Sequence, residues 1–325
     1  MQLSLRSLLV CLFIFCFLIS TAFASVTSTP KRLKVVPTSL NMLAGSFFQI
    51  YLVNGWQRQT FDEKFHELKQ RGMDHVIWQW TADSFHKKTY YPTTMSGWEN
   101  EVGYDAVGVS LASAKANGLK VWLGLNWTDD WWNHYGNDKP WLQNEFAISQ
   151  NVCNELWNKY KLDYNDTIAG FYITMEVDNV NYDSPSQQQN MIDVYATLTN
   201  YIHTTTHKPV MVAPFFNESC GMTPTGFADF WGNILKTAPI DIVAMQDGVG
   251  VHHVKTTTVG EWYKKMRDKI NSVRPTTELW SDLETFDEVN DEFNPASNVR
   301  ILEQIQAERP YVKKFTTFAW LHYNM

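Results

Sequence analysis

Two glutamates stand at the ends of short apolar runs that are typical of buried strands. The run Ile168–Ile173 leads into Glu176, and the run that begins at Glu278 leads into Glu284. Because strand side chains alternate between two faces, each glutamate falls on the more polar face of its run. Glycoside hydrolysis needs two carboxyl groups that flank one bond, with one group kept protonated by burial or by a like charge. These glutamates are therefore the candidate catalytic pair, and a structural ion pair at the rim is the alternative role for each.

Other polar and aromatic side chains also fall at predicted strand ends, and we expect them to bind substrate. They are Gln49, Trp80, Asn126, Trp127, Asp178, Gln246, Asp247, Asp282, Trp320 and His322. The chain holds 14 tryptophans in 325 residues, and aromatic faces pack well against the C–H faces of sugar rings. For Asp178, Asp247 and Asp282 a structural role is favoured over substrate contact. Two roles stay open for His322: a hydrogen-bond donor to sugar hydroxyls, or a rim residue whose partners lie within the protein.

The predicted elements alternate strictly between strand and helix. Strands are predicted at 46–52, 75–80, 119–127, 168–176, 208–215, 241–245, 278–284 and 314–323, and helices at 60–70, 105–117, 143–160, 186–204, 226–237, 259–273 and 296–308. Strict alternation predicts an α/β protein with a parallel sheet, and eight strands predict a closed (β/α)8 TIM barrel. A doubly wound open sheet is the alternative, but no glycine-rich turn follows the first predicted strand.

Closure of such a barrel would gather the predicted strand ends at one mouth, where barrel enzymes carry their active sites. A parallel α/β barrel of this length is usually one domain. The sequence ends two residues after the last predicted strand. We therefore expect a single-domain barrel that lacks its last helix.

The first 24 residues have the pattern of a secretory signal peptide. Arg6 precedes an apolar run over 8–19, and Ala22-Phe23-Ala24 matches a cleavage site. A membrane anchor is the alternative, although the run is short for a bilayer. We therefore expect a signal peptide over 1–24, a lead-in segment over 25–44 and the barrel over 45–325. The mature protein would then be secreted or periplasmic, with no membrane span.

Composition disfavours several other classes of function. The formal net charge is −7 and no cluster of Lys or Arg stands out, which disfavours a nucleic-acid partner. Secretion would permit a disulfide between Cys153 and Cys220, but Cys153 falls inside a predicted helix and Cys220 follows a predicted strand, so we expect two unpaired thiols. Their spacing is not that of metal ligands, and we expect no metal site and no cofactor. His252 and His253 are interpreted as loop residues rather than as a metal pair.

Five segments together resemble a known family. They are 45–49, 170–176, 245–250, 280–286 and the last predicted strand, and the stretch Gln246-Asp247-Gly248-Val249-Gly250 is the most distinctive. They are similar to an uncharacterised bacterial family that is catalogued as a domain of unknown function and grouped with glycoside-hydrolase TIM barrels. The resemblance covers the chain from about Ala44 to the end.

Within the wider clan, the glutamate on strand four is the acid/base and the glutamate on strand seven is the nucleophile. Carried over by position, the resemblance implies that Glu176 is the acid/base and Glu284 the nucleophile of a retaining mechanism. The chain departs from the clan at Met175, where an asparagine usually precedes the first glutamate.

The expected function is a secreted or periplasmic glycoside hydrolase that cleaves an oligo- or polysaccharide without a cofactor. One alternative is a non-catalytic glycan-binding barrel in polysaccharide export or cell-surface assembly, and another is a metal-dependent deacetylase. A carboxyl separation of about 5 Å would support retention, whereas one well above about 10 Å would favour binding alone.

Overall fold

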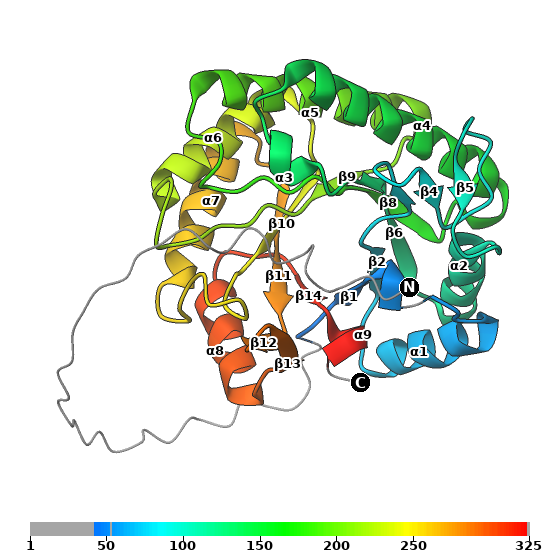
Figure 1. The fold of residues 1–325 in the computed structure, drawn as a ribbon. Coiled ribbons are helices and arrows are strands. Elements are labelled where there is room, and N and C mark those ends of the chain that lie inside the picture. The colour runs from blue at the N-terminus through cyan, green and yellow to red at the C-terminus, as the bar shows by residue number, and fades with distance from the viewer. Residues whose placement is uncertain (1–41, 53, 324–325) are drawn as a thin grey trace. The chain divides into compact units, whose positions relative to one another are not determined.

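Within the residues that the computed structural model describes, 42–52 and 54–323, eight parallel strands close a barrel (Figure 1). In chain order they are β1 (Gly45–Phe48), β2 (His75–Trp78), β6 (Lys120–Gly124), β8 (Ile168–Ile173), β9 (Val210–Val212), β10 (Ile242–Gln246), β11 (Glu278–Glu284) and β14 (Phe315–Phe318). Each pairs with its neighbours in the chain, and β1 pairs with β14 to close the ring. The predicted (β/α)8 TIM barrel is confirmed. The predicted signal peptide and nearly all of the lead-in lie outside the described residues.

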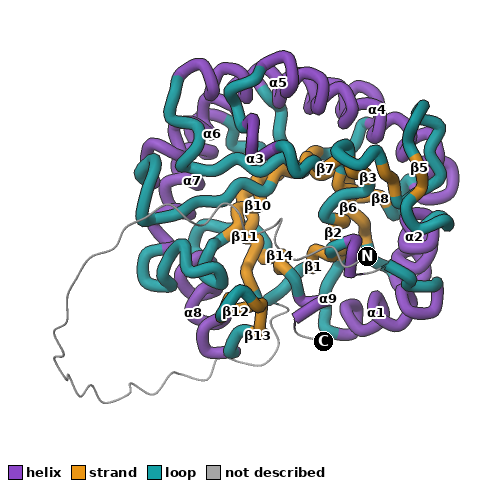
Figure 2. The backbone as a smooth tube through the Cα atoms, viewed as in Figure 1, coloured by secondary structure: helices purple, strands orange, loops and turns teal. Residues whose placement is uncertain are grey.

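Helices surround the barrel and connect successive strands (Figure 2). They are α1 (Arg58–Gln70), α2 (Ala106–Asn117), α4 (Lys139–Tyr164), α5 (Pro185–Thr206), α6 (Pro224–Thr237), α7 (Val259–Val273) and α8 (Asn298–Glu308). Local signals set their ends. The Ser184 side chain accepts from the Gln187 N–H and the Gln187 side chain accepts from the Ser184 N–H, which caps α5. The Asp138 side chain caps α4, and Pro140 lies in the first turn of the helix. Because of these two signals α4 begins earlier than predicted.

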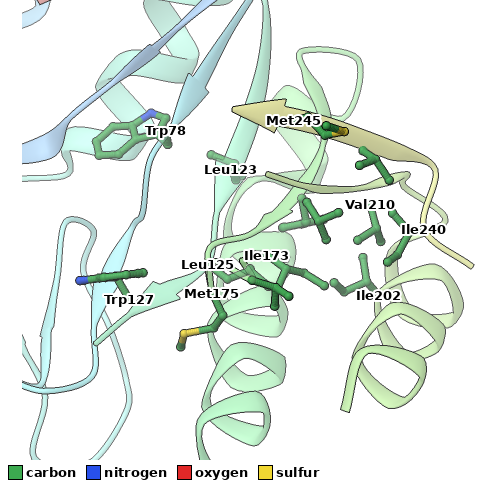
Figure 3. Close-up of a cluster of buried hydrophobic side chains, with 14 of the residues drawn as sticks. Trp78, Leu123, Leu125, Trp127, Ile173, Met175, Ile202, Val210, Ile240 and Met245 are labelled. Carbon is green, nitrogen blue, oxygen red and sulfur yellow. The ribbon is translucent and has the colours of Figure 1, made fainter. Parts of the chain in front are cut away.

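Strand alternation divides the apolar side chains between the barrel interior and the layer under the helices. Tyr172 lies in the interior cluster with Trp122 and Trp280. Ile173 and Met175 face outward, into the layer that Figure 3 shows in part. Aromatic rings therefore fill much of the barrel interior.

Short strands and a one-turn helix lie around the mouth of the barrel. The segments β3 (Ala82–Asp83), β4 (Lys88–Thr89), β5 (Glu99–Asn100) and β7 (Asn126–Trp127) form a short sheet, and α3 (Trp131–His134) is a single turn. The hairpin of β12 (Phe286–Val289) and β13 (Glu292–Pro295) follows β11. Its turn places Asn290 and Asp291 at φ 55° and 63°, the left-handed region that two-residue hairpin turns require.

The first and last predicted strands are longer than those observed. After β1 the chain forms the 3-10 turn η3 (Ile50–Leu52), and after β14 it forms the one-turn helix α9 (Trp320–Tyr323). The N–H of Trp320 donates to Thr317 Oγ1 at 3.2 Å, and the N–H of His322 donates to the Ala319 carbonyl at 3.0 Å. These local bonds turn the chain away from the strand direction. Among the described residues, α9 stands where a full helix follows the other strands.

The described part of the chain contains no helix that combines the length and the apolar character needed to cross a membrane.

Candidate active site

Glu176, Gln246, Asp282 and Glu284 meet at the carboxyl ends of β8, β10 and β11. The register of β10 and β11 sets Gln246 beside Asp282, and the Gln246 side chain hydrogen-bonds to Glu176. Burial, then the charges of Asp247, Glu284 and Glu176, raise the pKa of Asp282 well above its usual range. Asp282 is therefore within electrostatic reach of both predicted catalytic glutamates. The structure brings the two glutamates to the same end of the barrel, around this aspartate.

Glu176 lies just past the end of β8 and is half-buried. Its main chain is fixed by Trp131 Nε1, which donates to the Glu176 carbonyl at 2.7 Å, and by Tyr195 Oη, which donates to the Met175 carbonyl at 3.1 Å. Burial and the nearby Asp178 raise the pKa of Glu176 to about 7, against the hydrogen bond from Gln246. A carboxyl group that titrates near neutral pH can both give and accept a proton, as a general acid/base must.

Glu284 ends β11 and is only 6% exposed. Its Oε2 accepts a hydrogen bond from the main-chain N–H of Val251 at 3.0 Å. Burial and the charge of Asp247 raise the pKa of Glu284 to about 8, while the N–H groups of Val251 and Gly250 favour its ionised form. A Cβ at Gly250 would lie 3.0 Å from Glu284 Oε2 and 2.3 Å from the Phe286 carbonyl oxygen. The loop after β10, which the sequence marked as distinctive, thus wraps the Glu284 carboxyl group.

No ion pair in the part of the chain that is described involves Glu176 or Glu284. Arg300, whose charge reaches Glu284 and lowers its pKa, pairs instead with Asp287 at 3.0 Å. Among the described contacts, neither glutamate therefore forms the rim ion pair that was its alternative role.

Gln49 and His322 hold the end of β1 against α9. The Gln49 N–H donates to His322 Nε2 at 2.9 Å, so the ring is neutral with its proton on Nδ1. Burial, and then the charge of Lys64, lower the pKa of His322 to about 4. The Gln49 side chain accepts from Tyr323 Oη at 3.4 Å. Both residues thus have partners within the fold.

Trp320 does not lie at the mouth as predicted. Its ring packs against the layer under the helices, with the Arg71 guanidinium 5.4 Å above it. The physical reason is that β14 ends at Phe318 and the chain then turns into α9, so Trp320 does not stand at the end of a barrel strand.

Asn126 also faces away from the barrel interior. It is fully buried, its Nδ2 donates to Glu145 Oε2 at 3.2 Å, and its Oδ1 accepts from Ser149 Oγ. Both partners lie on α4. The amide group is used to attach β7 to this helix, which corrects the expectation of a substrate contact.

Asp178 and Asp247 are buried, and their oxygens accept hydrogen bonds within the fold. Asp178 accepts from the N–H groups of Val180 and Asn181 at 2.6 and 2.7 Å, which shapes the loop after β8. Asp247 faces α8, where Gln304 donates to it. The side chains of both aspartates thus have partners within the fold, as the structural role favoured for them in the sequence requires.

A row of rings runs along the loops at the mouth. Trp80 and Trp127 stack with centroids 6.0 Å apart, Trp132 lies 5.8 Å from Trp127, Phe215 lies 6.2 Å from Trp132, and His253 lies 6.4 Å from Phe215. All are half-buried except Trp127, which is 8% exposed. The predicted site residues include only the two stacked indoles. Phe215 ends a predicted strand, so the sequence held a signal for this ring, whereas His253 comes from a loop whose path the strand pattern does not predict.

Across the described residues, no group of three or more His, Cys, Asp or Glu side chains is arranged to hold a metal ion. The deacetylase alternative therefore has no ligand set in this part of the chain. Cys153 is buried and Cys220 is exposed, and both are free thiols as predicted.

Residues 43–325 match the family described as Domain of unknown function (DUF4434). A protein of Escherichia coli strain K12, Uncharacterized protein YbcH, is 24% identical over 210 residues, which cover 60% of this chain and 64% of that protein. The match thus spans less than two thirds of that relative.

Solved structures of similar fold include glycoside hydrolases. A protein described as a "putative alpha-L-fucosidase" from Bacteroides thetaiotaomicron has a TM-score of 0.76 at 18% identity, covering 91% of this chain and 93% of its own. An endo-1,4-beta-D-mannanase from Thermotoga petrophila has a TM-score of 0.59 at 13% identity, covering 85% and 87%. At such identities the likeness shows the fold alone. The family match covers most of the chain, so this protein belongs to the DUF4434 family and has the fold of glycoside-hydrolase TIM barrels.

Proposed function

We propose that this chain is a glycoside hydrolase that cleaves an oligo- or polysaccharide, with Glu176 as acid/base and Glu284 as nucleophile. One observation carries the proposal. The two glutamates come from β8 and β11, reach the same end of the barrel, and have no lysine or arginine partner among the described residues.

The donors that each carboxyl group receives support the assignment of roles. Glu284 accepts from the main-chain N–H of Val251, and fixed N–H donors favour the negative charge that a nucleophile carries. Glu176 has a pKa near 7 and a side-chain amide as its partner, which suits a group that must gain and lose a proton. The pKa of Glu284, about 8, lies above that of Glu176, about 7, so Glu284 mostly holds a proton in the empty site near neutral pH and must lose it before it acts as the nucleophile.

The row of rings supports a carbohydrate substrate. Trp80, Trp132 and Phe215 are half-buried rings at the mouth, and such rings can stack on the C–H faces of sugars. Similar folds act on glycans according to their names, which include a mannanase and a chitinase. The signal-peptide pattern over 1–24 supports a secreted or periplasmic location.

A panel of glycans, including bacterial exopolysaccharides, tests the proposal, with products read by mass. Glu176→Gln and Glu284→Gln should each lose turnover by roughly a thousandfold or more. Glu145→Gln is the matched control, because Glu145 is a buried glutamate that serves the Asn126 contact. Full activity of both glutamine variants on a cleaved glycan would end the assignment.

The anomer that first forms, read by NMR, tests the retaining mechanism. Retention supports Glu284 as a nucleophile, and inversion would make it a base that activates water. The non-catalytic alternative predicts that the native chain and both glutamine variants bind glycan, and that none of the three releases a product.

A further inference from the structure

Glu308 is a buried carboxyl group that the proposed mechanism does not use. It ends α8 and is 0% exposed, and neither of its oxygens accepts a hydrogen bond from an N–H or O–H group of the described residues. The side chains of Asp247 and Ser281 lie beside it, and Ser281 Oγ is likewise unpartnered. An ionised carboxylate without donors in such a place would cost several kcal/mol.

Asp247, in contrast, is surrounded by donors. Its Oδ1 accepts from the N–H groups of Val249 at 3.2 Å and Glu284 at 3.3 Å, and its Oδ2 accepts from Gln304 Nε2. Three N–H donors favour the ionised form of the Asp247 carboxyl group, and burial raises its pKa only to about 6 against these donors, so Asp247 is mostly ionised at pH 7. A carboxylate of this kind can also accept the O–H of a protonated neighbour.

A single proton therefore satisfies both groups. If Glu308 holds it, the Glu308 O–H donates to Asp247, and the other Glu308 oxygen can accept from Ser281 Oγ. We propose that Glu308 is protonated and donates to ionised Asp247, forming an acid–carboxylate pair that carries one negative charge directly behind Glu284 and sets the pH at which Glu284 ionises.

The electrostatics of the surrounding elements agree with this arrangement. Burial, then the charge of Asp247, raise the pKa of Glu308 well above its usual range. The charge of Asp247 is also the main influence, after burial, that raises the pKa of Glu284. The pair reaches Glu284 through space and through the Glu284 N–H, so Glu308 and Asp247 are positioning residues.

The other charged or titratable groups of the packed elements have different partners. Arg300 of α8 pairs with Asp287 of β12, and Arg267 of α7 donates to the carbonyls of Tyr311 and Leu279. Tyr263 of α7 donates its hydroxyl to the Met245 carbonyl. Asp282 of β11 lies on the opposite, interior face of its strand. None of these is a hydrogen-bond donor to Glu308 among the described contacts.

Infrared difference spectroscopy of the full chain tests the proton directly. The spectrum of the native protein minus that of Glu308→Gln at pH 7 should contain a protonated-acid C=O band and no carboxylate bands. Glutamine keeps the size of the side chain and can donate to Asp247, so this variant should fold. Carboxylate bands in the difference spectrum would overturn the proposal.

A second titration tests the control of Glu284. Native protein minus Glu284→Gln spectra, taken over a range of pH, give the midpoint of Glu284 ionisation. In an Asp247→Asn background this midpoint should fall by roughly one pH unit or more, because a nearby like charge is removed. Glu145→Gln should leave it in place. An unchanged or raised midpoint in folded Asp247→Asn protein contradicts the proposal, and if that variant does not fold, the Glu308→Gln spectrum decides.

These measurements use no substrate. A chain that cleaves no glycan can still show the pair, and an active hydrolase can lack it, so the two proposals fail separately.

Discussion

Replacing Glu176 by glutamine should remove activity and also make the protein more stable at neutral pH. The pKa of Glu176 is raised from its ordinary value of 4.5 to about 7, so the folded state holds a proton that the unfolded chain releases above pH 4.5. The folded state then binds more protons than the unfolded state, and the free energy of unfolding falls as pH rises through this window. At pH 7 the loss from this one group is about 3 kcal/mol.

A glutamine side chain does not titrate, so its contribution to the free energy of unfolding does not change with pH in this range. Its carbonyl oxygen can still accept from Gln246, as the protonated carboxyl group does. The net expectation is a variant that is more stable than the native chain by about 3 kcal/mol at pH 7 and equal to it near pH 4.

Chemical denaturation at both pH values, followed by fluorescence, measures this difference. Glu63→Gln, an exposed glutamate on α1, is the control and should show no pH-dependent gain. The reasoning fails if Glu176→Gln changes the free energy of unfolding equally at both pH values, since the pKa of Glu176 would then be the same in the folded and unfolded states.

Three further substitutions test the surroundings of the pair. Gln246→Leu removes the hydrogen bond that lowers the pKa of Glu176, so the high-pH limb of kcat/KM should move to higher pH, and a shift to lower pH would contradict this. Gly250→Ala forces a methyl group against Glu284 and the neighbouring carbonyl; it should cost roughly 1–3 kcal/mol in unfolding experiments and impair turnover, whereas a fully active and equally stable variant would show that the loop can move. Trp80→Ala should raise KM for the cleaved glycan by about 2- to 10-fold with little change in kcat, and an unaffected KM would take this ring out of the binding surface.

Strand positions and faces could be predicted because the strands are buried on both sides. Alternation in 278–284 placed Leu279 and Leu283 outward and Asp282 and Glu284 inward, and the structure agrees. The last predicted strand, 314–323, extends beyond the observed β14. Local hydrogen bonds around Thr317 turn the backbone after Phe318, and such bonds leave no periodic trace in a sequence.

The spacing of Gln304 and Glu308 on α8 is a sequence signal that could have identified them as buried polar residues. Ile301, Gln304, Ile305 and Glu308 recur at helical spacing and form the buried face of this helix. Polar side chains on an otherwise apolar stripe need partners inside the protein. The sequence could reveal that Gln304 and Glu308 are unusual, but their partner Asp247 lies on another element.

The amino-acid sequence by itself determined the order of strands and helices, the barrel that they close and the inward face of each glutamate, because these follow from short-range periodicity and from the need to bury apolar side chains. Only the tertiary structure decided which polar groups face the mouth and which face a helix. It set Asp282 within electrostatic reach of both glutamates, turned Asp247 toward Glu308 and wrapped the loop after β10 around Glu284. Those outcomes depend on strand register and on contacts between segments far apart in the chain, and the ionisation of a carboxyl group depends on exactly those neighbours.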